Sequence, residues 1–463
     1  MPNYKKLHIY VATLLVVTCA LLSTSGKLLV ITSGLAIITG TALLPFHISL
    51  SILLFLSGII PQSSNVDKLF LVFEKFSFSE LALTGILLRV LTETLVGKEN
   101  FLLKKIHVSI FFKFFLFLGL FFILGITKNG LVNTITDTRS FYLYLAIIPA
   151  AYSAHKNAEK TLQWFIWTIA AASIVICIEF ILINRLKIYI PYEYMPDLHD
   201  DNRVSLRNGG FFIFSFGILA YLIKSKTSSA PEKAIYFAIL SLIFFSSFLA
   251  QNRTNIATYV IQILIIHLLG KNITIKLLAT TGAKVVGVVF FIYVLSLMFP
   301  GTVFSEVINR FLLALNPEEN TDTLIARSSM IAAAWTRFTE SPLIGLGLGS
   351  KFEIVLLEYD LGVNYYIDNL WVVTLCKFGL IGFIPFSIYV YRSIIANSIK
   401  ASFSRRNLHH HEIYNIYIIM LTGELMMSLT TAMLWVHVAS IIPFSILTGI
   451  LLTHQRRGNE NHR

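Results

Sequence analysis

Three arginines in this 463-residue chain stand beside apolar segments, where they could bind phosphate groups. Arg203 and Arg207 follow the acidic stretch D-L-H-D-D-N and precede an apolar segment, and Arg253 lies in the short polar turn Q-N-R-T-N between two apolar segments. A guanidinium group can bind two phosphate oxygens through a planar pair of N–H donors. The same side chains could instead only extend their charges from a membrane into water. The spacing therefore indicates a phosphate or diphosphate site at a membrane surface, or else solvated charges.

A possible general base follows later in the chain. Asp368 and Asn369 stand directly before an apolar segment, and the sequence G-L-I-G follows after nine intervening residues. A carboxylate in this place can take a proton from an acceptor hydroxyl. Alternatively, Asp368 caps the helix that begins there, and both roles can hold together.

The segment before this aspartate adds an arginine and a run of glycines. Arg327 begins the sequence R-S-S-M, and residues 342–349 read P-L-I-G-L-G-L-G. Three glycines alternating with apolar residues permit a close backbone approach to a neighbour or a ligand. A phosphate-binding P-loop is excluded, because no G-K-[ST] follows.

Other residues of metal-binding or catalytic types point less clearly to a site. His409, His410, His411 and Glu412 lie beside basic residues and are interpreted as part of a solvated loop rather than a metal tract. Glu424 falls in the middle of an apolar segment, where an ionisable group is a functional candidate. The three cysteines lie in apolar runs and are expected to be packing residues. We expect no metal site and no cofactor.

The elements that must position these residues are transmembrane helices. Hydrophobic residues make up 56% of the chain and charged residues only 13%, with a mean hydropathy of +0.73. Soluble domains carry about 25% charged residues. Apolar windows of about 20 residues recur along the chain, as helices that cross a bilayer require. The candidate spans are 8–24, 28–43, 46–61, 79–97, 108–126, 140–154, 161–184, 209–223, 234–250, 254–269, 278–298, 368–396, 414–433 and 434–453. The fold class is therefore an all-α integral membrane protein with about 12–14 transmembrane helices.

The distribution of basic residues predicts the topology. The formal net charge is +12, but the Lys and Arg clusters are short and lie beside spans, which is typical of cytoplasmic loops and argues against nucleic acid binding. With the N-terminus inside, alternation places these clusters in the cytoplasm and exports 299–367. We expect both termini in the cytoplasm and the active site on the outer face. The predicted parts are N-terminal helices (1–298), an external loop subdomain (299–367), and C-terminal helices with a cytoplasmic tail (368–463).

In their order along the chain, the polar motifs resemble the O-antigen ligase and O-antigen polymerase superfamily of bacterial envelope enzymes. The resemblance rests on Asp137-Thr138-Arg139, on Q-N-R-T around Arg253, on Arg327 through the glycines at 342–349, and on D-N followed by G-L-I-G. It covers residues 120 to 400. It implies a GT-C-like membrane glycosyltransferase of the bacterial inner membrane, acting on its periplasmic face without a metal.

The resemblance also implies the substrates and the residue roles. The donor would be a glycan on undecaprenyl diphosphate, in the lipid bilayer, with a chain-length regulator or other envelope assembly proteins as further partners. Two arginines can neutralise a leaving diphosphate without a metal. The expected catalytic residues are Asp368 and Arg253, and the expected substrate-binding residues are Arg203, Arg207, Arg327 and Asn369.

One substitution favours one branch of the superfamily. Family ligases carry a histidine where this sequence has Asp368, and an ionised aspartate can accept a proton but cannot donate a hydrogen bond. A polymerase of surface polysaccharide is therefore favoured over a ligase that transfers polymer to lipid A-core. A transporter or flippase of lipid-linked glycans, and a non-catalytic scaffold of an envelope complex, remain the alternatives from other classes.

Overall fold

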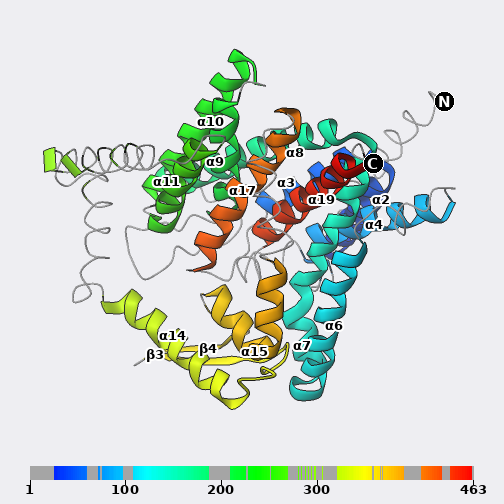
Figure 1. Cartoon of the computed structure of the whole chain (residues 1–463), viewed down its shortest axis with the longest axis vertical. Coiled ribbons are helices and arrows are strands. Elements are labelled where there is room, and N and C mark those ends of the chain that lie inside the picture. The colour runs from blue at the N-terminus through cyan, green and yellow to red at the C-terminus, as the bar shows by residue number, and fades with distance from the viewer. Residues whose placement is uncertain are drawn as a thin grey trace. The chain divides into compact units, whose positions relative to one another are not determined.

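The chain is mainly helical, with two short pairs of strands (Figure 1). The computed structural model describes residues 26–59, 71–72, 76–96, 108–186, 209–225, 228–250, 252–269, 321–356, 359–364, 367, 369–390, 408–429 and 438–460, with single positions between 280 and 305. The helices are α2 (Gly26–Leu43), α3 (Phe46–Ile59), α4 (Phe78–Val96), α6 (Val108–Asn129), α7 (Leu131–Thr138), the 3₁₀ helix η1 (Arg139–Ala146), α8 (Ile147–Leu186), α9 (Gly209–Lys224), α10 (Ala230–Leu249), α11 (Arg253–Leu268), α14 (Thr321–Glu340), α15 (Leu370–Val390), α17 (Leu408–Ser428) and α19 (Val438–Glu460). Most of these helices, α7 and α14 excepted, lie in apolar segments that were predicted as spans, which confirms the helical class.

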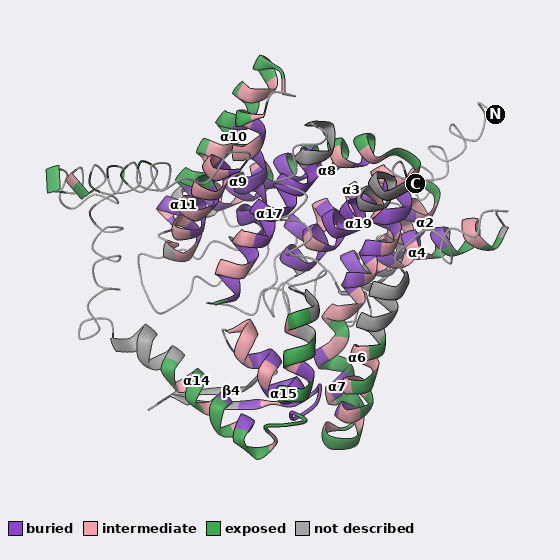
Figure 2. Cartoon of the chain, in the orientation of Figure 1, coloured by how far each residue is buried: buried purple, intermediate pink, exposed green. Residues whose placement is uncertain are grey.

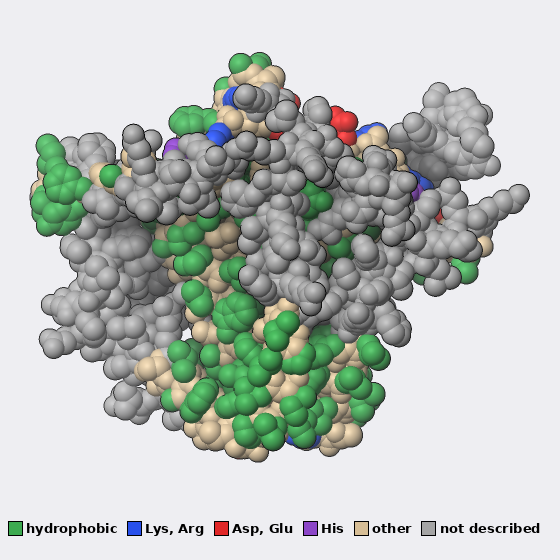
Figure 3. Space-filling model, in the orientation of Figure 1, with side chains coloured by type: hydrophobic (Ala, Val, Ile, Leu, Met, Phe, Trp, Pro, Cys, Tyr) green, Lys and Arg blue, Asp and Glu red, His purple; other side chains and the backbone are tan. Residues whose placement is uncertain are grey.

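Two helical stretches in the described residues are long and apolar enough to cross a bilayer, Leu131–Leu182 and Ala230–Leu249. Shorter apolar helices accompany them at Ser33–Leu43, Phe46–Ile59, Leu116–Asn129, Gly210–Lys224, Thr254–Leu268, Leu370–Pro385 and Ala439–Thr453. Large apolar side chains also cover much of the surface around α6, α14 and α15 (Figure 3). A surface of this kind suits contact with lipid. The number of 12–14 spans and their orientation stay predictions.

The described helices group into two compact units that interleave in sequence. Unit 1 comprises Met1–Phe114, Ser140–Leu198 and His437–Arg463, and unit 2 comprises Phe115–Arg139 and His199–Val436. The three parts predicted from the sequence (1–298, 299–367 and 368–463) were defined by the side of the membrane on which each loop lies. That division stays a prediction. All the expected site residues belong to unit 2.

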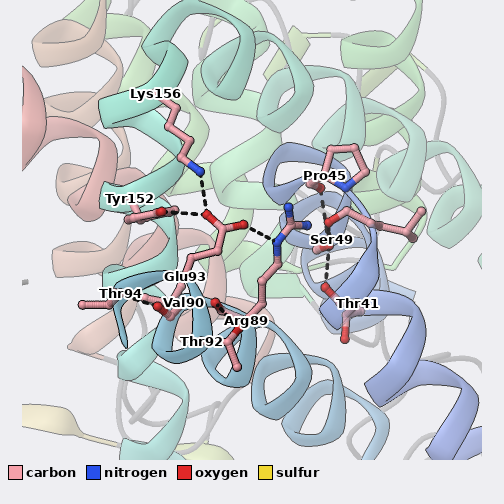
Figure 4. A network of polar contacts seen from close by, with 11 residues as sticks. Thr41, Pro45, Ser49, Arg89, Val90, Thr92, Glu93, Thr94, Tyr152 and Lys156 are labelled. Carbon is pink, nitrogen blue, oxygen red and sulfur yellow. Dashed lines mark hydrogen bonds and ion pairs between the residues drawn. The ribbon is translucent and has the colours of Figure 1, made fainter. Parts of the chain in front are cut away.

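In unit 1, α8 packs against α3 and α19, and α2 packs against α4. Figure 4 shows how a polar network ties three of these helices together. The carboxylate of Glu93 accepts from Arg89 Nε (2.9 Å), Lys156 Nζ (2.6 Å) and the hydroxyl of Tyr152 (2.7 Å). The Arg89 guanidinium also lies 4.3 Å from the centre of the Phe46 ring, a favourable cation–π distance. The network therefore fixes α4 against α8 and α3.

Helix α8 contains a non-helical residue, Asn157, with φ −156° and ψ 96°. It lies in the basic segment between the predicted spans 140–154 and 161–184. The side chain of Asn157 accepts from the amide of Lys160 at 2.9 Å, which resembles the start of a new helix. Two helical segments therefore meet where the sequence predicted a break.

In unit 2, α9 packs against α10, α11 and α17. Most of the described residues of α9 and α17 are buried (Figure 2). The start of α10 is a capping box, in which Ser229 and Glu232 bind each other's backbone amides, and Pro231 follows at a position that tolerates proline. Helix α11 starts at Arg253 because the side chain of Asn252 accepts from the amide of Asn255 at 3.2 Å.

A second group of elements in unit 2 contains α14, α15 and a β-hairpin. Helix α14 lies within residues 299–367, which were predicted to form an external subdomain. The hairpin of β3 (Phe352–Leu356) and β4 (Tyr359–Asn364), antiparallel and packed against α14, was not predicted. Its signal was the β-branched and aromatic content of F-E-I-V-L and Y-D-L-G-V-N. A further strand pair, β1 (Leu71–Val72) with β2 (Phe76–Ser77), lies in unit 1.

Candidate active site

Helices α9 and α17 run antiparallel. Asn415 Nδ2 donates to the hydroxyl of Tyr221 at 3.0 Å. Eight residues further along α17, a Cβ on Gly423 would lie 2.4 Å from the Cγ2 of Ile213 in α9. From the first contact to the second, the residue number rises from 415 to 423 in α17 and falls from 221 to 213 in α9, so the two helices run in opposite directions. The start of α9 and the end of α17 therefore lie at the same end of the pair.

Helix α11 runs parallel to α9 and contacts both helices. Gln262 Nε2 donates to the carbonyl oxygens of Ile213 (3.0 Å) and Ile419 (3.3 Å). One turn later, Ile266 packs with Ile419 and with the last part of α9. Arg253 lies nine residues before Gln262, or about 13 Å at 1.5 Å per residue. The first residue of α11 therefore lies toward the end of the bundle where α9 starts and α17 finishes.

The start of α15 is at this same end. Asn369 Nδ2 donates to the carbonyl oxygen of Leu429, just after α17, at 3.3 Å. Its Oδ1 accepts from the amide of Val372 at 3.0 Å, which is the bond of a helix N-cap. Asn369 therefore fills the capping role considered for Asp368. Asp368 itself lies outside the described residues.

Arg327 lies in α14, which packs against α15. The Sγ of Cys376 donates to the carbonyl oxygen of Ala334 at 3.2 Å. The residues after α14 contact turns of α15 that follow Cys376, so the two helices run in the same direction. Arg327 lies seven residues before Ala334, and Asn369 lies seven residues before Cys376. The backbone of Arg327 therefore lies toward the Asn369 end of α15.

The structure thus brings Asn369 and the backbones of Arg253 and Arg327 toward one end of unit 2. The structure describes Asn369 completely and Arg253 and Arg327 by their backbone. Arg203 and Arg207 lie outside the described residues; Arg207 stands two residues before α9 in the sequence. The hydrogen bonds behind this arrangement join residues 42 to 194 positions apart in sequence, so hydropathy could not have shown it.

Helix α15 is broken at Gly379, which has φ 59° and ψ −176°. The rings of Trp371 and Phe383 lie 6.5 Å apart, although twelve residues of straight helix would span about 18 Å. The apolar segment 368–396, predicted as one span, therefore contains two half-helices that fold toward each other. Glycine permits this turn because the left-handed region disfavours other residues.

The glycine run, residues 342–349, occupies this break. Four main-chain hydrogen bonds join the two segments: Leu346 N to Cys376 O (2.9 Å), Gly347 N to Lys377 O (3.0 Å), Leu380 N to Pro342 O (2.9 Å) and Ile381 N to Leu343 O (3.0 Å). Peptide groups freed by the break are thus paired with the glycine run. The close approach predicted for these glycines is to a neighbouring backbone.

The opposite side of the glycine run contacts α6 and α7. Asn129 Nδ2 donates to the carbonyl oxygens of Leu346 (2.9 Å) and Leu348 (3.0 Å). Lys128 Nζ donates to the carbonyl oxygen of Gly345 at 2.8 Å. The run is therefore held between the end of α6 and the broken helix.

A buried ion pair crosses the same place and was missed in the sequence. Lys377 of α15 pairs with Asp137 of α7, and their side chains are 0% and 1% exposed. Asp137 Oδ2 also accepts from the amide of Gly349 at 2.6 Å. Asp137 belonged to a recognised motif, but Lys377 had no assigned role. Its position inside an apolar segment was the available signal.

The remaining candidates have local roles in the described residues. Glu412 accepts from the hydroxyl of Ser225 at 2.5 Å, and Glu424 is fully buried in α17. No group of three or more His, Cys, Asp or Glu side chains in the described part of the chain could hold a metal ion. The described residues therefore offer no metal centre.

Comparison with known proteins identifies the part of the chain that carries these motifs. Residues 235–387 match a family model described as O-Antigen ligase. The match includes α11 with Arg253, α14, the glycine run, and most of α15. A search of curated proteins found no match. Members of this family are membrane-bound enzymes that transfer glycans in surface-polysaccharide biosynthesis. Residues 235–387 are therefore similar to the O-antigen ligase family, which confirms the resemblance seen in the sequence over this part of the chain.

Proposed function

We propose that this protein is a membrane glycosyltransferase that polymerises undecaprenyl-diphosphate-linked glycan repeats on the periplasmic face of the inner membrane. The observation that carries the proposal is the convergence of the starts of α9, α11 and α15 at the end of α17 in unit 2. Each of these helix starts carries or follows an expected site residue. The family match over residues 235–387 supports the reaction class.

The donor diphosphate is assigned to the arginines. Arg253 begins α11, where the partial positive charge of a helix N-terminus adds to its own charge. Arg203, or Arg207 in its place, precedes α9, and Arg327 approaches from α14. Guanidinium groups converging on a diphosphate neutralise the charge that develops as it leaves. Arg253 is the catalytic member of the set, and the others bind substrate.

The acceptor is assigned to the start of α15. Asp368 takes the proton of an acceptor hydroxyl while that oxygen attacks the anomeric carbon of the donor sugar. The bond from that carbon to the diphosphate breaks, and the diphosphate leaves on its lipid carrier. Asn369 caps α15 and binds substrate beside Asp368. The hydrogen bond from Asn369 to Leu429 supports a fixed position for this helix end.

A ligase that transfers polymer to lipid A-core is the second candidate within the same class. Polymerase is favoured because this chain has Asp368 where family ligases have a histidine.

A transporter of lipid-linked glycans is the candidate from another class, and the broken helix α15 is a feature that transporters share. In transporters, the peptide groups freed at such a break bind the substrate or ion. Here four of the hydrogen bonds at the break go to the glycine run. This arrangement supports a structural role for the break and favours the enzyme.

The glycan profile of a strain lacking the protein tests the proposal. A polymerase predicts surface glycan reduced to one repeat unit, and re-expression should restore the ladder. Free polymer that never reaches its acceptor would instead identify a ligase. Loss of all lipid-linked glycan from the outer leaflet would identify a transporter.

A further inference from the structure

Asp137 and Lys377 form a connection that the proposed reaction does not use directly. Two fully buried charges are costly to remove from water, and such pairs are not in general a source of stability. Their burial in unit 2 therefore requires another explanation. The surrounding contacts provide one.

Asp137 holds two segments at once. Its carboxylate pairs with Lys377 in the first half-helix of α15 and accepts from the amide of Gly349 at the end of the glycine run. Thr134, one turn earlier in α7, donates its hydroxyl to Leu348 O at 3.3 Å. Helix α7 therefore holds the end of the glycine run and the half-helix that the run supports.

The half-helix held in this way begins at the proposed acceptor site. Lys377 lies eight residues after Asn369, about 12 Å along the helix. Gly379 separates this half-helix from the rest of α15, so the second half does not fix its direction. The contacts of α7 and the glycine run fix it together with the packing of α14 and the bond from Asn369 to Leu429.

We propose that Asp137 and Lys377 are a positioning pair for the transfer reaction, which sets the angle of the first half of α15 and so aligns Asp368 and Asn369 with the donor. Resting on the proposed function, this inference adds a residue pair remote from the substrate. Misplacement of a reacting group by about 1 Å can cost about 100-fold in rate. The pair thus acts on turnover rather than on donor binding.

Two double variants separate charge, hydrogen bonding and folding. Single variants would leave one buried charge without its partner and threaten folding. In Asp137→Leu/Lys377→Met, both charges and the acceptor for Gly349 are removed, with side chains of similar size. In Asp137→Asn/Lys377→Met, both charges are removed but an oxygen remains for the Gly349 amide.

The first measurement is of position and needs no catalysis. Cysteines replace Asn369 and Leu429, whose hydrogen bond joins α15 to α17, in a full-length chain whose native Cys19, Cys177 and Cys376 are replaced by alanine. Disulfide formation is measured in membranes after mild oxidation. We expect the crosslink to fall strongly with Asp137→Leu/Lys377→Met and to recover only in part with Asp137→Asn/Lys377→Met, which keeps the bond to Gly349 but not the bond to Lys377.

The second measurement is of turnover, with Asn369 and Leu429 intact. The probe is the lipid-linked glycan extracted from the strain that lacks the protein, and initial transfer rates are measured in isolated membranes. For Asp137→Leu/Lys377→Met we expect kcat to fall about 100-fold with KM for the donor unchanged, and the Asn-containing variant should recover only part of kcat. The matched control is Arg337→Ala/Glu340→Ala, which removes an exposed ion pair of α14 and should change neither result.

The outcomes separate this inference from the proposed function. An unchanged crosslink in Asp137→Leu/Lys377→Met would overturn positioning, and so would unchanged turnover with an altered crosslink. Full recovery in Asp137→Asn/Lys377→Met would also overturn it, because Lys377 would then have no part in the positioning. The proposed function itself is tested by other variants, those of Arg253 and Asp368.

Discussion

Gly345 and Gly379 touch backbone to backbone across the break in α15. A Cβ on Gly345 would lie 2.4 Å from the amide nitrogen of Gly379, and a Cβ on Gly379 would lie 2.4 Å from the amide nitrogen of Gly345. Both residues have positive φ, 80° and 59°. Neither position therefore has room for any side chain.

This contact predicts the effect of adding one methyl group. Gly345→Ala or Gly379→Ala should destabilise the protein by about 3 kcal/mol, from left-handed backbone strain and forced separation of two main chains. Thermal unfolding in detergent, followed by loss of the monodisperse peak, measures the change. The control is Gly119→Ala in α6, where the described residues leave open space around a Cβ; it should be neutral or stabilise by about 0.5–1 kcal/mol. Equal stability of all three variants would show that the glycine run does not pack in the break.

The proposed diphosphate grip predicts that Arg253→Lys loses most activity while the protein still inserts. Lysine keeps the charge but lacks the planar pair of donors that holds two phosphate oxygens. Polymer length on gels, compared at equal amounts of membrane protein, measures the effect. Polymer of normal length would indicate that Arg253 only extends its charge into water.

Asp368→Asn separates catalysis from capping. The amide keeps the size of the side chain and its capping ability but cannot take a proton, so transfer should be abolished while donor binding is nearly intact. Because Asn369 already caps α15, the change in stability should be well under about 1 kcal/mol. Donor retention and glycan transfer are measured on the same membranes. A fully active variant would end the catalytic role and leave the arginines as the whole site.

Asp368→His is the companion experiment. It restores the residue type of the family ligases, and imidazole can also act as a base. Activity retained with histidine but lost with asparagine would show that a base is needed at this position. Loss of activity with both would show a specific need for a carboxylate.

The predicted topology is tested with single cysteines at Ser305 and Ser402. Ser305 should react with an impermeant thiol reagent from outside, and Ser402 only after the membrane is permeabilised, because the basic residues near Ser402 favour the cytoplasm. Labelling of both from outside would contradict the topology.

Helix positions could be predicted from the sequence, whereas the break in α15 could not. The apolar segments 209–223 and 254–269 match α9 and α11 closely, because hydrophobic content over about 20 residues is a local property. The segment 368–396 looks equally apolar. What breaks it is its pairing with residues 342–347, together with contacts from Lys128, 217 residues before Gly345.

The sequence predicted which residue types form the candidate site, but not the buried ion pair that holds the start of α15 in place. Arg253 and Asn369 stood out because polar residues at the ends of apolar segments need a reason. Lys377 was passed over, since its partner Asp137 lies 240 residues away. Only tertiary contacts show that the two charges meet.

The break at Gly379 also imposes an order on assembly. The two half-helices of α15 would expose unpaired peptide groups to hydrocarbon until other segments pair with them, and lipid offers no substitute. The glycine run and the helices α6 and α7 that hold it all precede α15 in the chain. A ribosome working from the N-terminus therefore delivers the receiving surface first, and α15 can bend into it as soon as it is synthesised.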